Sequence, residues 1–164
     1  MKFIIEPLAA YHDREAFDCE EPSLNDFLKL YARQNDKKGL GKTFVAVTPD
    51  KNTKIGGYYT ISSGALDAEN LPENLPRYSI PIMHIGRLAV DKTVKGQGLG
   101  NLLLLDALRR SMNAGAQIGV YAVEVRALTE QAKSFYLKFG FVEMTDDPLR
   151  LYLTIKKIRK LDLV

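Results

Sequence analysis

The stretch "IGRLAVDKTVKGQGLGNLLLLDAL", residues 85–108, is the most informative part of the sequence, because three different patterns follow one another within it. Its start is strand-like, its middle holds glycines at positions 96, 98 and 100, and its end has the pattern of a leucine-rich buried helix. Glycines let a ligand approach the backbone, and the free N–H groups at a helix N-terminus attract phosphate. The stretch therefore predicts a strand, a phosphate-binding loop and a helix.

Strands and helices alternate along the rest of the chain. Apolar runs bounded by turn residues predict strands at 1–8, 42–49, 54–66, 82–91, 118–128, 141–144 and 150–158. Helical spacing predicts helices at 22–39, 98–116 and 129–140; the apolar stripe of the first comprises Leu24, Phe27, Leu28 and Tyr31. Three prolines indicate a long loop over 67–81. This order predicts an α/β (α+β) fold, a mixed central β-sheet flanked by helices, in a single domain of residues 1–164.

The composition excludes several classes of protein. One cysteine, Cys19, cannot form a disulfide framework, and with only His12 and His84 beside it we expect no metal site. No apolar run approaches the roughly 20 residues that span a bilayer, and the N-terminus turns acidic before a signal-like core develops. We therefore expect a cytoplasmic protein with no membrane partner. The net charge of +3 is a weak indication of an anionic partner.

Two other phosphate loops fit the glycines less well. "GLGKT", residues 39–43, would need a glycine at position 36 to be a Walker A loop, and that position is Asp; a strand-like segment follows it. A dinucleotide fingerprint requires G-x-G-x-x-G, whereas the spacing here is G-x-G-x-G. A glycine-rich turn without a ligand remains the third alternative.

Residues 85–108 and "TEQAKSFYLKFGF", residues 129–141, together resemble the two motifs of the GNAT acetyltransferases. Lys95 stands where the loop motif has Gln or Arg, and Thr129 stands where the second motif often has Asn. The resemblance implies the GNAT fold and acetyl-CoA as acetyl donor, with its pyrophosphate on the loop amides. It implies cofactor contacts from Leu88, Ala89 and Val90 through their backbone, and from Lys95, Gly96, Gln97, Gly98, Leu99, Gly100, Asn101, Thr129 and Phe135.

The same resemblance assigns the catalytic role to one residue. The tyrosine of "FY" in the second motif, Tyr136, protonates the departing thiolate of CoA; the alternative is that Tyr136 only packs on the apolar face of a short helix. Cys19 lacks a nearby histidine in its motif, so we expect direct transfer without an acyl-cysteine. His84 either relays a proton or packs as a hydrogen-bonded core residue. Arg87 either orients the substrate or is a solvated strand residue.

A narrower resemblance covers almost the whole chain. "FDCEEPSLNDFL" (17–28), "GGYYTISSGAL" (56–66) and "IPIMHIGRLAVD" (80–91) resemble toxins of bacterial type II toxin–antitoxin pairs, which acetylate the α-amino group of aminoacyl-tRNA and block translation; Glu20 stands where they usually have Gly. The resemblance implies a ribbon-helix-helix antitoxin, contact with operator DNA only through the antitoxin complex, and a homodimer. The aminoacyl pocket is expected in the loop around 64–80. The alternatives are an ordinary GNAT enzyme acting on a small amine or protein amino group, and a non-catalytic acyl-CoA-binding regulator.

Basic residues recur every four positions along the predicted helix 22–39, opposite its apolar stripe. Such a row follows the phosphates of a nucleic acid, or it is merely a solvated helix face. With the toxin resemblance, the candidate tRNA contacts are Lys29, Arg33, Lys37, Lys38, Lys42 and Arg87. A second basic cluster near the end of the chain comprises Lys156, Lys157, Arg159 and Lys160.

Overall fold

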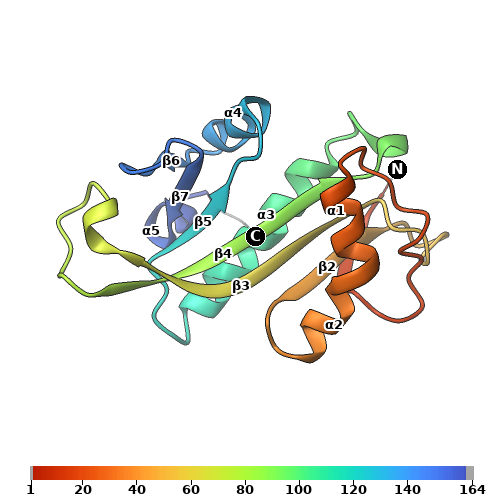
Figure 1. Ribbon diagram of the computed structural model, residues 1–164, viewed down its shortest axis with the longest axis horizontal. Helices are drawn as coiled ribbons and strands as arrows, with labels where there is room; N and C mark the ends of the chain where they lie inside the picture. The colour runs from red at the N-terminus through yellow and green to blue at the C-terminus, as the bar shows by residue number, and fades with distance from the viewer. Residues whose placement is uncertain (1, 162–164) are drawn as a thin grey trace. The chain divides into compact units, whose positions relative to one another are not determined.

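The computed structural model describes residues 2–161, and its strands form one seven-stranded sheet of order β1-β2-β3-β4-β5-β7-β6 (Figure 1). The strands are β1 (Ile4–Pro7), β2 (Lys42–Val47), β3 (Gly57–Asp67), β4 (Ser79–Val90), β5 (Ala122–Arg126), β6 (Val142–Glu143) and β7 (Arg150–Thr154). β4 and β5 pair in parallel, whereas β1 with β2, β2 with β3, β5 with β7 and β6 with β7 pair antiparallel. The prediction of a mixed central sheet is confirmed.

The helical segments follow the predicted order. They are α1 (Pro22–Asp26), the π-helical turn η1 (Phe27–Tyr31), α2 (Ala32–Lys37), the short 3₁₀ turns η2 (Ala68–Asn70) and η3 (Lys92–Val94), α3 (Leu99–Gly115), α4 (Glu130–Lys138) and α5 (Ile155–Arg159). The leucine run of α3 places Leu103, Leu104 and Leu108 in the interior, while Leu102 is exposed. Within the described residues, no helix combines the length and apolar character needed to cross a membrane.

The chain divides into two compact units. The first comprises residues up to 62 together with 86–107; its core includes Leu28, Val45 and Tyr58. The second comprises 63–85 together with the chain from 108 onward, and its core includes Ile82 and Tyr152. The single domain over 1–164 stays a prediction, and Met1 and residues 162–164 lie outside the described part of the chain.

The first predicted helix contains a π-helical turn that its sequence pattern did not reveal. The N–H of Ala32 donates to the carbonyl of Phe27, five residues earlier, which adds one residue to that turn. Ala32 consequently takes the interior position predicted for Tyr31, and Tyr31 is 52% exposed. The prediction that Tyr31 belongs to the apolar stripe was therefore wrong.

Two other predicted boundaries were also wrong. Residues 155–158 form helix α5 rather than the end of a strand, because the Thr154 side chain accepts a hydrogen bond from Lys157 N–H and caps a helix there. Strand β4 begins at Ser79, so Pro81 lies inside it rather than in the preceding loop. Pro81 has no N–H to donate, but its carbonyl accepts from Tyr121 N–H.

A buried hydroxyl fastens the first helical segment to the sheet, and we expect its loss to destabilise the fold. Tyr58 on β3 is fully buried and donates its hydroxyl to the Leu24 carbonyl at 2.6 Å. Tyr58→Phe keeps the ring, so the free energy of unfolding should fall by about 1 kcal/mol, the net contribution of one such bond. Urea denaturation measures this loss. Tyr31→Phe removes an exposed hydroxyl and should leave stability unchanged; equal effects of the two variants would contradict the prediction.

Candidate active site

The glycine-rich loop before α3 has a backbone that only glycine adopts readily. Gly96 and Gly98 have φ values of +81° and +79°, in the left-handed region. A Cβ atom added at either position would meet no atom within 4 Å, so packing against the protein is not what requires glycine. Residues 95–98 are exposed, whereas Leu99, the first residue of α3, is buried. The loop offers open, bare backbone at the N-terminus of α3.

The buried carboxylate of Asp91 fixes the position from which this loop starts. Asp91 is 4% exposed and accepts hydrogen bonds from the Asp18 N–H at 2.8 Å and from the N–H and hydroxyl of Thr93 at 3.0 and 2.5 Å. Burial would raise the pKa of Asp91, but these hydrogen bonds outweigh it and hold the pKa below its usual value. Asp91 is therefore charged and joins the end of β4 to residue 18.

Lys95 and Glu20, which both depart from the expected motifs, form an ion pair with each other. The Lys95 ammonium lies 2.8 Å from a carboxylate oxygen of Glu20, and both side chains are exposed. Glu20 has a φ of +72°, and its N–H donates a hydrogen bond to the Asp18 carboxylate. This hydrogen bond, together with those from Asn25 and Lys92, lowers the pKa of Asp18 to about 2. The hydrogen bond from Lys95 to Glu20 raises the pKa of Lys95, so the ammonium stays charged. A cation thus stands beside the loop, paired with a carboxylate.

Tyr136 lies on α4, which begins where the Thr129 hydroxyl accepts from Ala132 N–H at 3.0 Å. Its ring is 7% exposed and packs against Phe135 and Phe141, with ring centroids 5.3 and 5.5 Å away. Its hydroxyl makes no hydrogen bond to any of residues 2–161. Burial raises the pKa of Tyr136 to about 12, so the phenol is neutral near pH 7 and its proton is available to a ligand.

A buried carboxylate links three strands of the second unit. Glu124 on β5 accepts from His84 on β4 through one oxygen and from Arg150 on β7 through the other, at 2.8 Å from Nε and 2.7 Å from Nη2. Burial would raise the pKa of Glu124, but the bonds from His84 and Arg150 outweigh it and lower the pKa. Glu124 and Arg150 were not among the sequence candidates. No local motif could have found them, because strand pairing alone brings them to His84.

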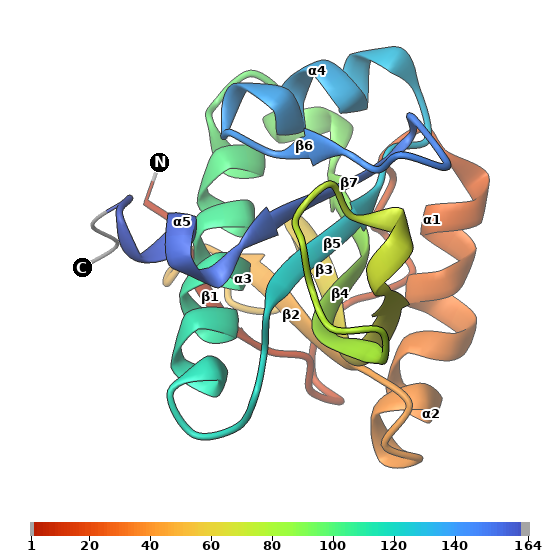
Figure 2. The ribbon, with the colours of Figure 1, turned by 90° about the vertical axis from the view of Figure 1, so that its left-hand side faces the viewer.

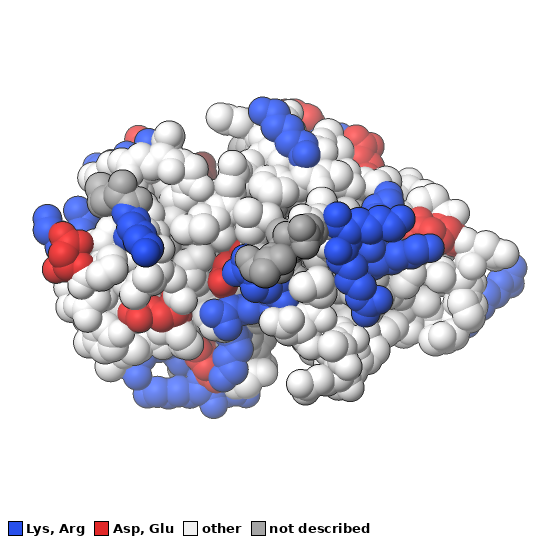
Figure 3. Space-filling view, turned by 180° about the vertical axis from the view of Figure 1, so that it is seen from behind, with Lys and Arg blue, Asp and Glu red and all other residues white. Residues whose placement is uncertain are grey.

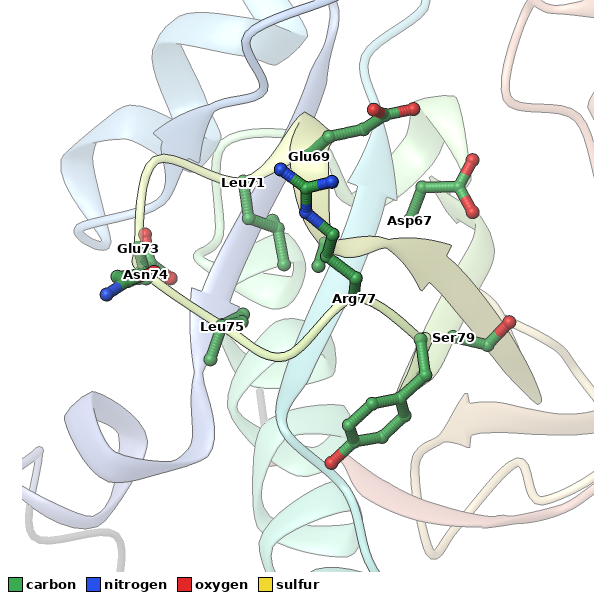
Figure 4. Close-up of a pocket in the computed structure, with 10 residues that line it drawn as sticks. Asp67, Glu69, Leu71, Glu73, Asn74, Leu75, Arg77 and Ser79 are labelled. Carbon is green, nitrogen blue, oxygen red and sulfur yellow. The ribbon is translucent and has the colours of Figure 1, made fainter.

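The loop between β3 and β4 encloses a cavity of about 650 Å³. Its lining comes entirely from residues 67–79, including Asp67, Glu69, Glu73 and Arg77, and Figure 4 shows Arg77 extending back over the loop toward Glu69. Glu73 fastens the loop by accepting from the hydroxyls of Tyr121 and Tyr152, and Figure 2 shows the loop crossing over β5. The cavity falls within residues 64–80, where the sequence predicted the aminoacyl pocket; its ligand stays a prediction.

The candidate tRNA contacts differ in how they are held. Lys29 and Arg33 are half-buried and Lys37 and Lys38 exposed, and none of these four forms an ion pair within residues 2–161. Lys42 is paired with Asp36 at 2.8 Å. The Arg87 guanidinium lies 3.6 Å from the centre of the Phe27 ring, a cation–π contact that fixes the side chain. Arg87 is therefore not a freely solvated strand residue.

The second basic cluster lies partly around a cavity. Lys156, Lys157 and Lys160 line a cavity of about 410 Å³ together with Tyr121 and Tyr152. Figure 3 shows that Lys and Arg side chains gather into groups on the face it displays.

The sequence candidates fall into both compact units. The glycine loop, the backbone of residues 88–90, Arg87 and the basic residues of the first helical segment belong to the first unit. Tyr136, Phe135, Thr129 and His84 belong to the second. Pairing of β4 with β5 covers Ile82–Ile85, while β4 continues to Val90, so the backbone of residues 86–90 has no partner from β5 in the described register. Within residues 2–161, no group of three His, Cys, Asp or Glu side chains could hold a metal ion.

Comparison with known proteins identifies the family. Residues 74–151 match the acetyltransferase (GNAT) domain. A tRNA-acetylating toxin of Mycobacterium tuberculosis is 36% identical over 152 residues, which are 91% of this chain and 90% of the relative. A mutant of KacT has a structure similar to this one, with a TM-score of 0.92, 32% identity, and coverage of 98% of this chain and 99% of KacT.

Two structures of AtaT show what that relative binds. AtaT complexed with acetyl-methionyl-tRNAfMet is 29% identical with a TM-score of 0.90, covering 98% of this chain and 99% of AtaT. AtaT in complex with its antitoxin AtaR and DNA is 28% identical with a TM-score of 0.81, covering 96% of this chain and 98% of that one. The predicted resemblance is confirmed: the chain belongs to the GNAT acetyltransferases, which use acetyl-CoA, and among them to the family of the tRNA-acetylating toxins.

Proposed function

We propose that this protein transfers the acetyl group of acetyl-CoA to the α-amino group of aminoacyl-tRNA, that it blocks translation in this way, and that a cognate antitoxin neutralises it. The observation that carries the proposal is the likeness, over nearly the whole of both chains, to AtaT bound to acetyl-methionyl-tRNAfMet. The open glycine loop and the available phenol of Tyr136 agree with it. The site of this chemistry is the cytoplasm, where charged tRNAs meet ribosomes.

Acetyl-CoA is held mainly by backbone. The amides of the loop from Lys95 to Asn101 face the pyrophosphate, and the β4 backbone of Leu88, Ala89 and Val90 pairs with the pantetheine arm in place of a β5 strand. Support comes from the left-handed glycines, which keep the loop bare, and from the end of the β4–β5 pairing at Ile85. Phe135 and Thr129 are the remaining proposed contacts, and the Thr129 hydroxyl also caps α4.

Tyr136 assists the departure of the CoA thiol. The α-amine of an aminoacyl ester is weakly basic because the ester withdraws electrons, so a neutral fraction that can attack the thioester is present near pH 7. The pKa of Tyr136 is about 12, and that of a thiol is about 8.5, so complete transfer to a free thiolate is uphill by about 5 kcal/mol. Tyr136 therefore donates a hydrogen bond that becomes a proton transfer only as the C–S bond breaks.

The proposed partners follow from the same family. Lys29, Arg33, Lys37 and Lys38, with Lys42 and Arg87, contact the tRNA backbone, and their freedom from ion pairs within residues 2–161 supports this for the first four. The antitoxin is of the ribbon-helix-helix type and carries the contact with operator DNA, and the toxin is a homodimer of one GNAT domain per chain. The complex of AtaT with AtaR and DNA supports the antitoxin assignment.

Transfer of labelled acetyl groups to a panel of acceptors tests the function. The panel contains charged tRNAs, the same tRNAs uncharged, a polyamine and a lysine peptide. Label in charged tRNA alone is the expected result. Label only in the polyamine or the peptide would replace the proposal with an ordinary GNAT activity, and no transfer to any acceptor despite acetyl-CoA binding would indicate a non-catalytic regulator.

A side chain at Gly98 should abolish acetyl-CoA binding. Gly98→Asp places atoms in the open space that the pyrophosphate would fill, and calorimetry should show at least about a 10²-fold loss of affinity, or about 2.7 kcal/mol. Gly39→Asp is the matched control, because Gly39 has a φ of +74° and equally open surroundings but lies outside the loop. The control should lose similar stability and keep its affinity. Undiminished affinity in Gly98→Asp would contradict the loop assignment.

Replacing Tyr136 by Phe should leave the fold and acetyl-CoA binding intact and lower turnover by about 10²-fold. Phe preserves the contacts with Phe135 and Phe141 and removes only the hydroxyl. Because the phenol is the active form and persists below its pKa of about 12, the wild-type rate should show no decline from this group up to about pH 10. Steady-state kinetics measures both effects; a Phe variant with near wild-type turnover would rule out the acid role.

Neutralising the basic row of the first helical segment should weaken tRNA binding. Replacement of Lys29, Arg33 and Lys37 by Gln should lower the slope of log affinity against log salt by about 2 to 3, because each phosphate contact contributes about 0.7 to 0.9. Binding measured across a salt series gives the slope, and acetyl-CoA affinity should not change. The same change at Lys156, Lys157 and Lys160 is the control, and a larger effect there would move the tRNA to the C-terminal cluster.

A further inference from the structure

The two lysines at the start of the glycine-rich loop are both paired with acidic side chains from one short segment, residues 18–20. The Lys92 ammonium lies 3.2 Å from a carboxylate oxygen of Asp18, and the Lys95 ammonium lies 2.8 Å from one of Glu20. All four residues belong to the first compact unit. The positive charge beside this loop is therefore already balanced from within the chain.

The two ion pairs differ in how firmly their carboxylates are held. Asp18 also accepts hydrogen bonds from the Glu20 N–H at 2.8 Å and from the Asn25 side-chain amide at 3.0 Å, which keep it in place. The Glu20 side chain has Lys95 as its sole partner among residues 2–161, and it is 61% exposed. Glu20 can consequently release Lys95 without breaking another contact.

The backbone at Glu20 also points to a role for its side chain. Its φ of +72° lies in the left-handed region, which glycine adopts readily and other residues rarely adopt. Among residues 2–161, Glu20 is the one residue other than glycine with a positive φ. An exposed side chain adds little packing energy to offset such a conformation, and conformations of this kind are concentrated at functional sites.

Lys95 is placed to exchange one anion for another. It directly precedes Gly96, the first left-handed glycine, and so adjoins the amides assigned above to the pyrophosphate of acetyl-CoA. A lysine side chain is a flexible stem that ends in a point charge, so one ammonium can contact Glu20 in the free protein and a phosphate oxygen in the complex. An exposed ion pair changes an equilibrium by no more than about fivefold, so a pyrophosphate with more than one negative charge can displace the carboxylate.

We propose that Glu20 is an internal competitor for the Lys95 ammonium, and that it thereby sets the affinity of the glycine-rich loop for the pyrophosphate of acetyl-CoA. This inference rests on the proposed contact between the loop and acetyl-CoA. In the free protein Glu20 holds the ammonium; on binding, the pyrophosphate takes its place and the carboxylate returns to solvent. Glu20 thus lowers the affinity of the loop for phosphate groups and has no effect on a ligand that lacks them.

A double-mutant cycle measured by calorimetry tests the competition. Glu20→Gln keeps the size of the side chain and removes its charge, so the affinity for acetyl-CoA should rise by about two- to fivefold. Lys95→Gln should lower the affinity. In the Lys95→Gln background, Glu20→Gln should have no effect, because the ammonium for which both anions compete is gone. An equal gain in both backgrounds would overturn the inference, since it would show direct repulsion between Glu20 and the ligand.

A matched ligand and a matched variant serve as controls. S-acetylpantetheine carries the acetyl thioester but no phosphate, so its affinity should be the same for Glu20→Gln and the wild type. Asp36→Asn breaks the exposed ion pair with Lys42, which has the same separation of 2.8 Å and lies outside the loop. This variant should keep the wild-type affinity for acetyl-CoA. A gain with S-acetylpantetheine as large as that with acetyl-CoA would contradict the competition.

Failure of this inference and failure of the proposed function give different results. Wild-type protein that does not bind acetyl-CoA would refute the proposed function. Competition at the loop would still be measurable with inorganic pyrophosphate, through the NMR shifts of the Gly96 and Gly98 amides. Saturation at a lower pyrophosphate concentration in Glu20→Gln than in the wild type would support the inference. Identical titrations would overturn it, and so would a Glu20→Gln protein that binds acetyl-CoA with wild-type affinity.

Discussion

The hydrogen bonds of the buried Asp91 carboxylate determine where the glycine-rich loop begins. β4 ends at Val90, and Asp91 immediately joins three segments: its carboxylate holds residues 18 and 93, and its own N–H donates to Gly56 at 2.8 Å. Lys92 N–H returns a bond to Asp18 at 2.9 Å. A charged group so deeply buried is costly unless all its hydrogen-bonding capacity is used, and here Asp18 and Thr93 use both oxygens. The left-handed glycines at 96 and 98 follow directly from this hydrogen-bonded junction in the chain.

Much of the fold could be predicted because its signals are local. The glycine spacing, the leucine run of α3 and the alternation of strands and helices depend on neighbouring residues and fixed repeats, and the structure confirmed them. The incorrect predictions also had local causes. A π-helical turn changes the phase of a helix without a characteristic composition, so Tyr31 was placed inside although Ala32 occupies that position. The Thr154 side chain caps helix α5, so the strand-like sequence after it forms a helix and not a strand.

The candidate site was only partly accessible to sequence reasoning. Tyr136 and the loop glycines belong to continuous motifs, whereas Glu124 and Arg150 join His84 through the pairing of three strands that are far apart in the chain. Glu20 and Lys95 are another example, because each looked like an isolated departure from a motif. Their ion pair spans 75 positions of sequence, so no local motif could have revealed it.

The stretch of β4 beyond its pairing with β5 also gives a ligand the means to stabilise the folded chain. A ligand that bonds to this backbone binds the folded chain and not the unfolded one, so it shifts the folding equilibrium by mass action. At a ligand concentration 100 times its Kd this linkage adds about 2.7 kcal/mol to stability. A cell rich in acetyl-CoA would therefore shield the folded enzyme from proteolysis, while starvation for acetyl units would expose it.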